Sequence, residues 1–444
     1  MSPKWGAGWD ASGFSRGEAE PRPSPPRLGV VTRMRATDIP IGFEHLYAVH
    51  MATTMNARHT NRARVSGAAE RSILNEWDRN RWVWNQCTAR SKELRRAGEP
   101  CGPAVLDKEL TGWRAQHPWL AEGSSVAQQQ TIRDFGAARS KAIKDVKARL
   151  PMKRRRGFPK FKKKGLALLS LNYTRRGFSL KDGRLHLAGG INLGIVWSRD
   201  LPSEPTSVRV LRDATGKTWA SFVVEVEVEP LLPVNRVIGI DWGVTDTATT
   251  TDPDFDLPHH QHGKGAAARL ARYQRMMARR KRPKGQAPSK GYGTAKAQAA
   301  NAYGKVARKR TDDARKWAKG VVLNHDQIAV EDFRPKFLAK TTMARKSADA
   351  AIGQAKRTLI WMATKHDRDL RLVDPAYTTM DCGNCSARTK HRLPLSERTY
   401  TCLVCGLVKP RDRNSAAVMV ARAGFDPPGA DRVRLDSPMG NRAA

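Results

Sequence analysis

Four cysteines near the end of the chain stand in two close pairs, and this pattern restricts the local fold more than any other. One pair lies in the segment CGNC and the other in CLVC, with sixteen residues between them. Two such pairs on two turns can place four thiolates around one tetrahedral ion, so zinc is favoured, with a redox-active pair as the alternative. A site filled by four cysteines has no open position, which predicts one structural Zn²⁺ that drives the folding of this segment. The predicted ligands are Cys382, Cys385, Cys402 and Cys405.

The charge balance indicates a polyanionic partner. The chain carries 80 Lys and Arg residues against 42 Asp and Glu residues, a formal net charge of +38, which is more than solubility requires. A hydrophobic content of 40% with 12 Trp indicates folded domains rather than a basic tail. The sequence has no apolar run of about 18 residues and no apolar core of a signal peptide. We therefore expect an intracellular, cytoplasmic protein that does not associate with a membrane.

Hydrophobic periodicity predicts how the chain is organised. Residues 1–34 and 426–444 are rich in Pro and Gly, and we expect both ends to be disordered. Residues 66–150 have helical periodicity, which Gly and Pro interrupt over 99–123. From 168 to 230 the period falls to two, which predicts a small β-barrel or sheet. Short apolar strands and basic helices then alternate up to the cysteine segment.

The segment KRRRGFPKFKKKG, at 153–165, has a high density of positive charge. Pro159 excludes a continuous helix, and two phenylalanines lie between the charges. This combination indicates a clamp on a nucleic-acid backbone, with the rings packing or stacking on a base; a solvated charge run is the alternative. The expected nucleic-acid contacts are Lys153, Arg154, Arg155, Arg156, Lys160, Lys162, Lys163 and Lys164.

Three acidic residues follow or flank apolar segments that would bury them, which is costly unless the acids are paired or bind a metal. Asp241 and Glu331 end apolar runs, and Asp412 lies just beyond the cysteines at the start of a predicted helix. Oxygen ligands suit Mg²⁺, and two ions about 4 Å apart would activate water and stabilise the leaving oxygen in phosphodiester hydrolysis. Taken singly, an Asp after a strand is also typical of a turn or a helix cap. Asp246 and Asp332 are expected to be uninvolved neighbours.

Other polar residues near the acids have two interpretations each. His259, His260 and His262 could bind a metal, but Pro flanks their loop, so an exposed surface is favoured. Arg411 and Arg413 flank the last acid, where they could contact the scissile phosphate or belong to a solvated helix start.

Several motifs together resemble one protein family. GIDWGVTDTATT, IAVEDF and the stretch from CGNC through LSERTYTCLVCGLVKPRDRNSAA are similar to the three split RuvC motifs and the zinc ribbon of TnpB nucleases and the related miniature type V CRISPR effectors. RRGFPKFKKK also resembles the GFPxFK stretch of TnpB. The resemblance runs from about residue 150 to 424, and more loosely from about 35.

The resemblance implies a multidomain α+β fold. A wedge-type β-barrel with a helical recognition module inserted in it would precede a RuvC-like nuclease domain, which is an α/β domain of the RNase H type with an inserted zinc ribbon. On this chain the wedge barrel would comprise 35–65 and 151–232, the recognition module 66–150, the RuvC-like domain 233–376 and 411–425, and the zinc ribbon 377–410.

The resemblance also implies a function. The protein would be an RNA-guided, Mg²⁺-dependent DNA endonuclease that cleaves target DNA beside a short flanking motif through a single RuvC-like site. Its partners would be a guide RNA and the target DNA, and its catalytic, metal-binding acids would be Asp241, Glu331 and Asp412. Charge and carboxylates alone indicate only a metal-dependent nuclease acting on a polyanion. Two residues depart from the family pattern: Trp242 stands where smaller aliphatic residues are common, and Ser415 replaces an Ala.

Two other functions stay open at the level of sequence. One is an RNA-guided DNA-binding protein that represses without cleavage, and the other is a basic zinc-ribbon RNA-binding protein with a structural role. Three acids at separate strand and helix ends favour a nuclease over the second alternative. A monomer is the favoured oligomeric state.

Overall fold

The structure is a computed structural model, and it describes residues 54–165, 167–283, 285–333, 338–339, 341–389, 391, 393–394 and 396–425. The ends expected to be disordered, 1–34 and 426–444, lie outside the described residues, as does 35–53 of the expected wedge segment. The described part is a mixed α and β structure, as predicted. None of its helices is long and apolar enough to cross a bilayer.

A seven-stranded antiparallel sheet, in the order β2-β6-β7-β1-β5-β4-β3, forms in the first half of the chain. Strand β1 is central although it precedes the helical segment in sequence. Alternate residues such as Tyr173 and Phe222 are fully buried, as the period of two predicts. Asp182 and Gly183 both have positive φ and connect β3 to β4 in the predicted hairpin. The strands are β1 (Thr54–Arg64), β2 (Ser170–Thr174), β3 (Phe178–Lys181), β4 (Arg184–Leu187), β5 (Ile191–Val196), β6 (Ser207–Arg212) and β7 (Thr218–Glu227).

A group of helices lies between β1 and β2 in sequence. Two of them occupy 99–123, where Gly and Pro interrupt the helical pattern. Pro103 and Pro118 are the first residues of these helices. The backbone N–H at this position has no partner within a helix, so proline loses no hydrogen bond there. The prolines that interrupt the sequence pattern therefore begin helices. Cys87 and Cys101 are buried in the core that these helices share, which is a packing role. The helices are α1 (Gly67–Arg96), α2 (Pro103–Gln116), α3 (Pro118–Ala121) and α4 (Ser125–Lys147).

A second sheet has the strand order β10-β9-β8-β11-β12. Strands β8, β9 and β10 pair antiparallel, whereas β11 and β12 run parallel to β8. A short two-stranded sheet follows it, formed by β13 and β14 in the cysteine segment. These elements are β8 (Val237–Trp242), β9 (Asp246–Thr250), β10 (Leu257–Pro258), α5 (His262–Arg279), α6 (Lys290–Asn324), β11 (Gln327–Glu331), α7 (Ala344–Ala350), α8 (Ile352–Lys365), β12 (Asp369–Val373), β13 (Thr399–Thr401), β14 (Val408–Pro410) and α9 (Arg411–Arg422).

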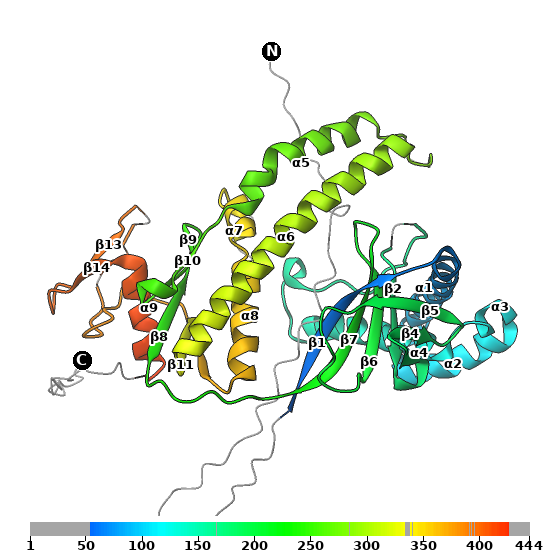
Figure 1. The fold of residues 1–444 in the computed structure, drawn as a ribbon, viewed down its shortest axis with the longest axis horizontal. Helices are drawn as coiled ribbons and strands as arrows, with labels where there is room; N and C mark the ends of the chain where they lie inside the picture. Colours follow the sequence, from blue (N-terminus) through cyan, green and yellow to red (C-terminus); the bar gives the residue numbers. More distant parts are fainter. Residues whose placement is uncertain are drawn as a thin grey trace, which may run out of the picture. The chain divides into compact units, whose positions relative to one another are not determined.

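Helices cover both faces of this second sheet. Ile238 and Ile240 of β8 are fully buried in a core with α6 and α8. Gly239, between them, faces α9 on the opposite side, because side chains alternate along a strand. Figure 1 shows α9 on one side of β8 and β11, with α6 and α8 on the other. A Cβ atom added to Gly239 would lie 2.0 Å from the carbonyl oxygen of Ala416, so α9 packs directly on the strand backbone.

We predict that Gly239→Ala lowers the free energy of unfolding by about 1–3 kcal/mol, because the added methyl group overlaps backbone rather than a flexible side chain. Urea unfolding measures the change. The matched control is Gly320→Ala in α6, where an added Cβ meets no heavy atom within 4 Å. The control should be neutral or stabilise by up to about 1 kcal/mol, since alanine favours a helix. Equal destabilisation by both substitutions would contradict the assigned contact.

Candidate active site and metal centre

Asp241 is the penultimate residue of β8, and Glu331 is the last residue of the neighbouring parallel strand β11. The register pairs Gly239 with Ala329, so the positions two residues further along, 241 and 331, lie side by side. Because side chains alternate, both acids project from the same face as Gly239, toward α9. Glu331 is 6% exposed, and Asp241 is half-buried. Two carboxyl groups therefore lie side by side at the C-terminal ends of two buried, apolar strands.

The third acid reaches this face from α9. Asp412 lies in the first turn of the helix, four residues before Ala416. Four helical residues advance about 6 Å and two strand residues about 6.6 Å. Ala416 lies against Gly239. If α9 runs antiparallel to β8, the two distances match, and Asp412 lies at the level of Asp241. The charge of Asp412 does act on Asp241 and raises the pKa of that carboxyl.

Burial and crowding raise the pKa values of the two strand acids. Burial is the largest cause for Asp241, whose pKa is raised well above its usual value, and the charges of Glu331 and Asp412 add to it. Burial also raises the pKa of Glu331 to about 7, although the backbone N–H of Trp242 opposes this effect. Arg411 and Lys356 already lower these pKa values in part, and a bound cation would favour the ionised form of both groups further.

The donor set fits a hard divalent cation such as Mg²⁺, because each acid offers carboxylate oxygens. Within the described ranges, two groups have ligand atoms that all lie within 4.8 Å of one another. They are the four cysteines and a cluster of His260, His262 and Asp313. The three acids are therefore spread more widely than the ligands of one tetrahedral ion.

Trp242 holds Glu331 in place. Its backbone N–H donates to Oε2 of Glu331 at 3.2 Å, and its indole Nε1–H donates to the Glu331 carbonyl oxygen at 3.1 Å. The ring is 5% exposed and packs edge-on against Trp317 of α6, with 5.7 Å between ring centroids. This departure from the family pattern thus ties the ends of β8 and β11 together, and the ring points into the core.

The arginines beside Asp412 bind protein groups. Arg411 is 7% exposed; its Nη1 donates to the Glu397 carbonyl oxygen at 3.0 Å, and its Nε donates to Oδ1 of Asp412 at 3.3 Å. Arg413 donates to Oδ2 of Asp256 at 2.8 Å. Both side chains therefore position the start of α9, which differs from the solvated helix start that the sequence left open.

Of the two acids expected to be uninvolved, Asp332 does act on the site, because its charge is among the causes that raise the pKa of Glu331. Oδ1 of Asp332 accepts from Nζ of Lys356 at 2.6 Å. Asp246 is exposed at the start of β9. Neither acid is among the charges that raise the pKa of Asp241.

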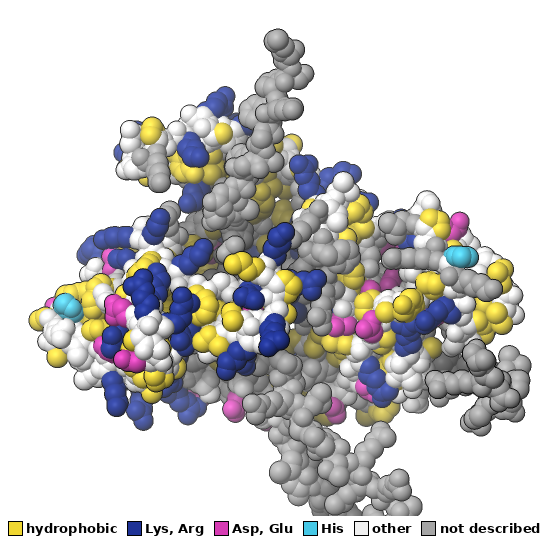
Figure 2. All heavy atoms as spheres, turned by 180° about the vertical axis from the view of Figure 1, so that it is seen from behind, with side chains coloured by type: hydrophobic (Ala, Val, Ile, Leu, Met, Phe, Trp, Pro, Cys, Tyr) yellow, Lys and Arg dark blue, Asp and Glu magenta, His cyan; other side chains and the backbone are white. Residues whose placement is uncertain are grey.

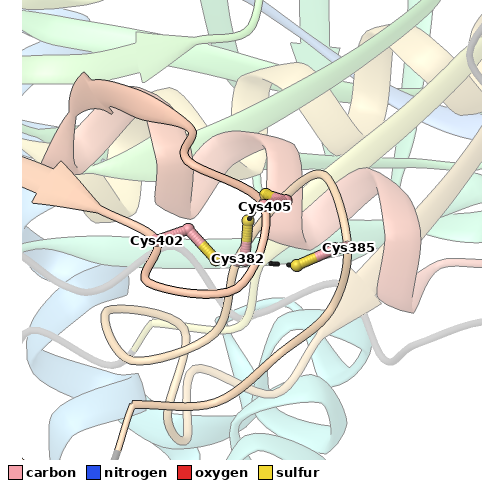
Figure 3. Close-up of side chains that lie close together, drawn as sticks. All are labelled: Cys382, Cys385, Cys402 and Cys405. Carbon is pink, nitrogen blue, oxygen red and sulfur yellow. Dashed lines mark hydrogen bonds between the residues drawn. The ribbon is translucent and has the colours of Figure 1, made fainter.

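The four cysteines converge at the turns before β13 and between β13 and β14 (Figure 3). The Sγ atoms of Cys382 and Cys405 are 3.7 Å apart, and those of Cys385 and Cys402 are 3.6 Å apart. Four sulfurs around one zinc at about 2.3 Å would lie about 3.8 Å from one another, so the donor set and spacing fit Zn²⁺. The backbone N–H of Leu407 lowers the pKa of Cys405 to about 6, whereas burial raises the pKa of Cys385 to about 12, so bound metal would supply the charge that favours thiolates at all four positions.

The cysteine segment is fastened to α9. Asn414 is fully buried; its Nδ2 donates to the Asp381 carbonyl oxygen at 2.8 Å, and its Oδ1 accepts from the Gly383 backbone N–H at 2.9 Å. Ser415, the second departure from the family pattern, donates from Oγ to the Thr378 carbonyl oxygen at 3.4 Å. The first CxxC turn is therefore fixed to the helix that carries Asp412.

Tertiary contacts divide the basic run at 153–164 into two groups. Nζ of Lys162 lies 3.9 Å from the ring centroid of Trp84 in α1, and Arg156 forms an ion pair with Asp145 at 2.8 Å. The rings of the run also face α1, where Nζ of Lys92 lies 4.6 Å from the centroid of Phe161. The basic residues of the run other than Lys162 are exposed: Lys153, Arg154, Arg155, Arg156, Lys160, Lys163 and Lys164.

Two family models match the chain over the ranges that hold these groups. A model named Cas12f1-like, TNB domain, matches residues 353–419, and the OrfB_IS605 model, described as "Probable transposase", matches 221–341. The first range includes the four cysteines and Asp412, and the second includes Asp241 and Glu331.

Curated proteins and a solved structure are similar over most of the chain. "Putative RNA-guided DNA endonuclease" of Streptomyces pristinaespiralis is 30% identical over 319 residues, which are 70% of this chain and 75% of the relative. "Putative RNA-guided DNA endonuclease InsQ" of Escherichia coli K12 is 26% identical over 368 residues, covering 77% of this chain and 86% of the relative. The cryo-EM structure of the Cas12f1-sgRNA-target DNA complex has a similar protein fold, with a TM-score of 0.50 at 11% identity over 82% of this chain and 98% of that chain.

We predict that Asp241→Asn stabilises the metal-free protein at neutral pH. Burial and like charges raise the pKa of Asp241 in the folded state. Such a group does not change the free energy of unfolding at pH values below its pKa in the unfolded chain, which is about 4, and lowers that free energy increasingly as the pH rises above it. The gain in the free energy of unfolding should therefore be small at pH 5 and larger at pH 8, which is above the pKa of about 7 of the neighbouring Glu331. Thermal unfolding in chelator measures it, with exposed Asp246→Asn as the control; a gain that does not change with pH would contradict the clustering of the acids.

Proposed function

The chain belongs to the TnpB-like family of RNA-guided DNA endonucleases, and we propose on this premise that it cleaves DNA selected by base pairing to a guide RNA. The observation that carries the proposal is that Asp241 and Glu331 share the face of the second sheet that α9 covers, while the charge of Asp412, in the first turn of α9, acts on Asp241. The order of that sheet, with β8 between antiparallel β9 and parallel β11, supports a RuvC-like domain of the RNase H type.

The three acids would hold Mg²⁺, and ions bound there would supply a water nucleophile at neutral pH and stabilise the leaving oxygen. The backbone N–H of Trp242 holds the Glu331 carboxyl group, and the indole holds the backbone carbonyl oxygen of the same residue. Arg411 likewise holds the carboxyl group of Asp412, because its guanidinium also binds carbonyl oxygens of the cysteine segment. Cleavage would thus depend on carboxylates whose positions are fixed before metal binds.

The cysteine segment is proposed as a structural Zn²⁺ site that supports the catalytic acids. Cys382 precedes Gly383, whose backbone N–H donates to Asn414, two residues after Asp412. A Cβ atom on Gly383 would lie 2.5 Å from Cβ of Ala417, so the turn and the helix are in direct contact. Zinc that rigidifies this turn would therefore fix the first turn of α9.

Guide RNA and target DNA are proposed to contact exposed basic surface, and protein contacts beside the target would read a short flanking motif. Figure 2 shows Lys and Arg side chains spread over one face of the molecule, with fewer acidic ones among them. The exposed part of the 153–164 run contributes to this positive surface. Trp84 fixes its path, because the indole Nε1–H donates to the Lys160 carbonyl oxygen at 2.9 Å.

We predict that alanine at any one of Asp241, Glu331 or Asp412 lowers guided DNA cleavage on the order of 10³-fold or more. The double variant Asp241→Ala/Asp412→Ala should be no slower than either single variant, because ligands of one metal site lose function together. Gel-based cleavage assays with Mg²⁺ and with chelator measure the rates.

The control is Asp246→Ala, an exposed acid on β9 that should cleave at the wild-type rate. Guided binding of target DNA should survive in all variants, since the acids make no base-pairing contact. Cleavage by Asp241→Ala would show that the acids are misassigned. A wild type that binds a guided target and never cuts would establish instead the alternative of repression without cleavage.

We predict that changing Lys153, Arg154, Lys160 and Lys163 to Gln reduces the slope of log binding constant against log salt by about 3, since each lost phosphate contact releases one counterion fewer. Filter binding of the guide RNA at a series of salt concentrations measures the slope. Lys162→Gln is the matched control within the run, because that ammonium lies over Trp84. The control should leave the slope unchanged. Equal slopes for the wild type and both variants would show that the run is solvated and does not contact RNA phosphates.

A further inference from the structure

A histidine cluster lies at the start of α5, on the side of the second sheet where β10 ends. The sequence favoured an exposed surface for His259, His260 and His262, and this is wrong for the first of them. The side chain of His259 is 3% exposed, that of His262 is 19% exposed, and that of His260 is 45% exposed. A contiguous segment thus has one buried imidazole beside two that reach solvent.

Two of these imidazoles share one carboxylate from a distant part of the sequence. Nδ1 of His260 lies 3.2 Å from Oδ2 of Asp313 in α6, and Nε2 of His262 lies 2.6 Å from the same oxygen. The two rings stack with 5.5 Å between centroids and 10° between planes. One nitrogen from each ring and one carboxylate oxygen all lie within 4.8 Å of one another. Two imidazoles and a carboxylate at this spacing are a typical ligand set for zinc and related metals.

The backbone between the two imidazoles is unusual. Gln261 has φ +50°, in the left-handed region that a residue other than glycine rarely adopts. Such a conformation is strained and persists where other interactions offset the strain. Here the turn accompanies the approach of His260 and His262 to one face, opposite Asp313.

An unsatisfied polar atom lies in the same cavity. The cavity has a volume of about 20 Å³, and its lining includes the three histidines, Asp313 and Asp349. About 10–15 Å³ is enough for one water molecule, so the space accepts one water or one ion. Nε2 of His259 is buried there, 4.0 Å from Oδ2 of Asp349, and has no hydrogen-bond partner among the residues that the structure describes. A buried imidazole nitrogen without a partner is rare and indicates a group that fills the cavity.

The charge of Asp349 is already compensated. Its carboxylate accepts from the backbone N–H groups of Gly263 and Lys264 at 2.7 and 2.9 Å and from Nη2 of Arg310 at 2.6 Å. Asp349 therefore fixes the beginning of α5 against α6 and α7. The carboxylate that both exposed imidazoles approach is that of Asp313, the group that a cation would use.

We propose that His260, His262 and Asp313 bind one divalent transition-metal ion of the class that imidazole prefers, such as Zn²⁺ or Co²⁺, with water completing the coordination. The ion would cross-link the start of α5 to α6, 51 positions apart in sequence for His262 and Asp313. This site is separate from the four cysteines and from the carboxylates proposed to bind Mg²⁺. Its role is to fix the base of the basic hairpin formed by α5 and α6.

Cobalt titration of the full-length, chelator-treated protein tests the proposal. Thiolate ligands give Co²⁺ an intense charge-transfer band, which imidazole and carboxylate ligands lack, so the two sites are distinguished by spectrum as well as by number. The double variant His260→Ala/His262→Ala should bind one equivalent fewer than the wild type and keep the thiolate band. Cys402→Ser should lose the thiolate band and retain the equivalent that the histidine variant loses.

Two further variants keep the test decisive. Asp313→Asn preserves the volume of the side chain and should also lose one equivalent, which covers the case in which the double variant fails to fold. His186→Ala, on β4 of the other sheet, should bind as much cobalt as the wild type. If the His260→Ala/His262→Ala and Asp313→Asn variants bind as much cobalt as the wild type, the proposal is wrong and the cluster is a hydrogen-bonded group without an ion.

Discussion

The contact between the backbone of α9 and Gly239 determines the geometry of the whole candidate site. The strand presents Asp241 two residues beyond this glycine, and the helix presents Asp412 four residues before the carbonyl group that it meets. Because both intervals span about 6 Å, the two acids come level only when the helix lies against the strand backbone. A side chain at position 239 would separate the layers and move one acid away from the other two. Gly239, which has no side chain, thus determines how closely Asp412 approaches Asp241.

Close packing of the acids has an electrostatic cost that the surrounding structure offsets in part. Burial and mutual repulsion raise the pKa values of Asp241 and Glu331, so the fold resists the charges that a metal site requires. Trp242 donates two hydrogen bonds to Glu331 from the sheet side, and Arg411 binds Asp412 from the side of the cysteine segment. These contacts come from two structural layers, and they offset part of the repulsion between the neighbouring carboxyl groups.

Much of this arrangement was predictable from sequence, because strands that end in acids and paired cysteines are local patterns. The remainder depends on partners that sequence spacing does not reveal. Lys162 belongs to a basic run and yet lies over Trp84, and His259 belongs to a polar loop and yet is buried. Ala351 adopts φ +53° between α7 and α8, although alanine is a strong helix former. For Lys162 and His259, tertiary packing outweighs the preference of the residue itself.

The chain order of the site has a consequence for synthesis on the ribosome. Of the three elements that carry the acids, β8 is synthesised first and β11 second, and α9, with Asp412, is the last described element of the chain. Domains fold progressively from the N-terminus as they are made, so a nascent chain can complete the seven-stranded sheet long before the final acid appears. A chain interrupted before residue 411 would retain the basic run and the first two acids without the third. Such a fragment could occupy nucleic acid but could not assemble the full carboxylate set, so incomplete translation products would be competitors of the finished protein rather than unregulated nucleases.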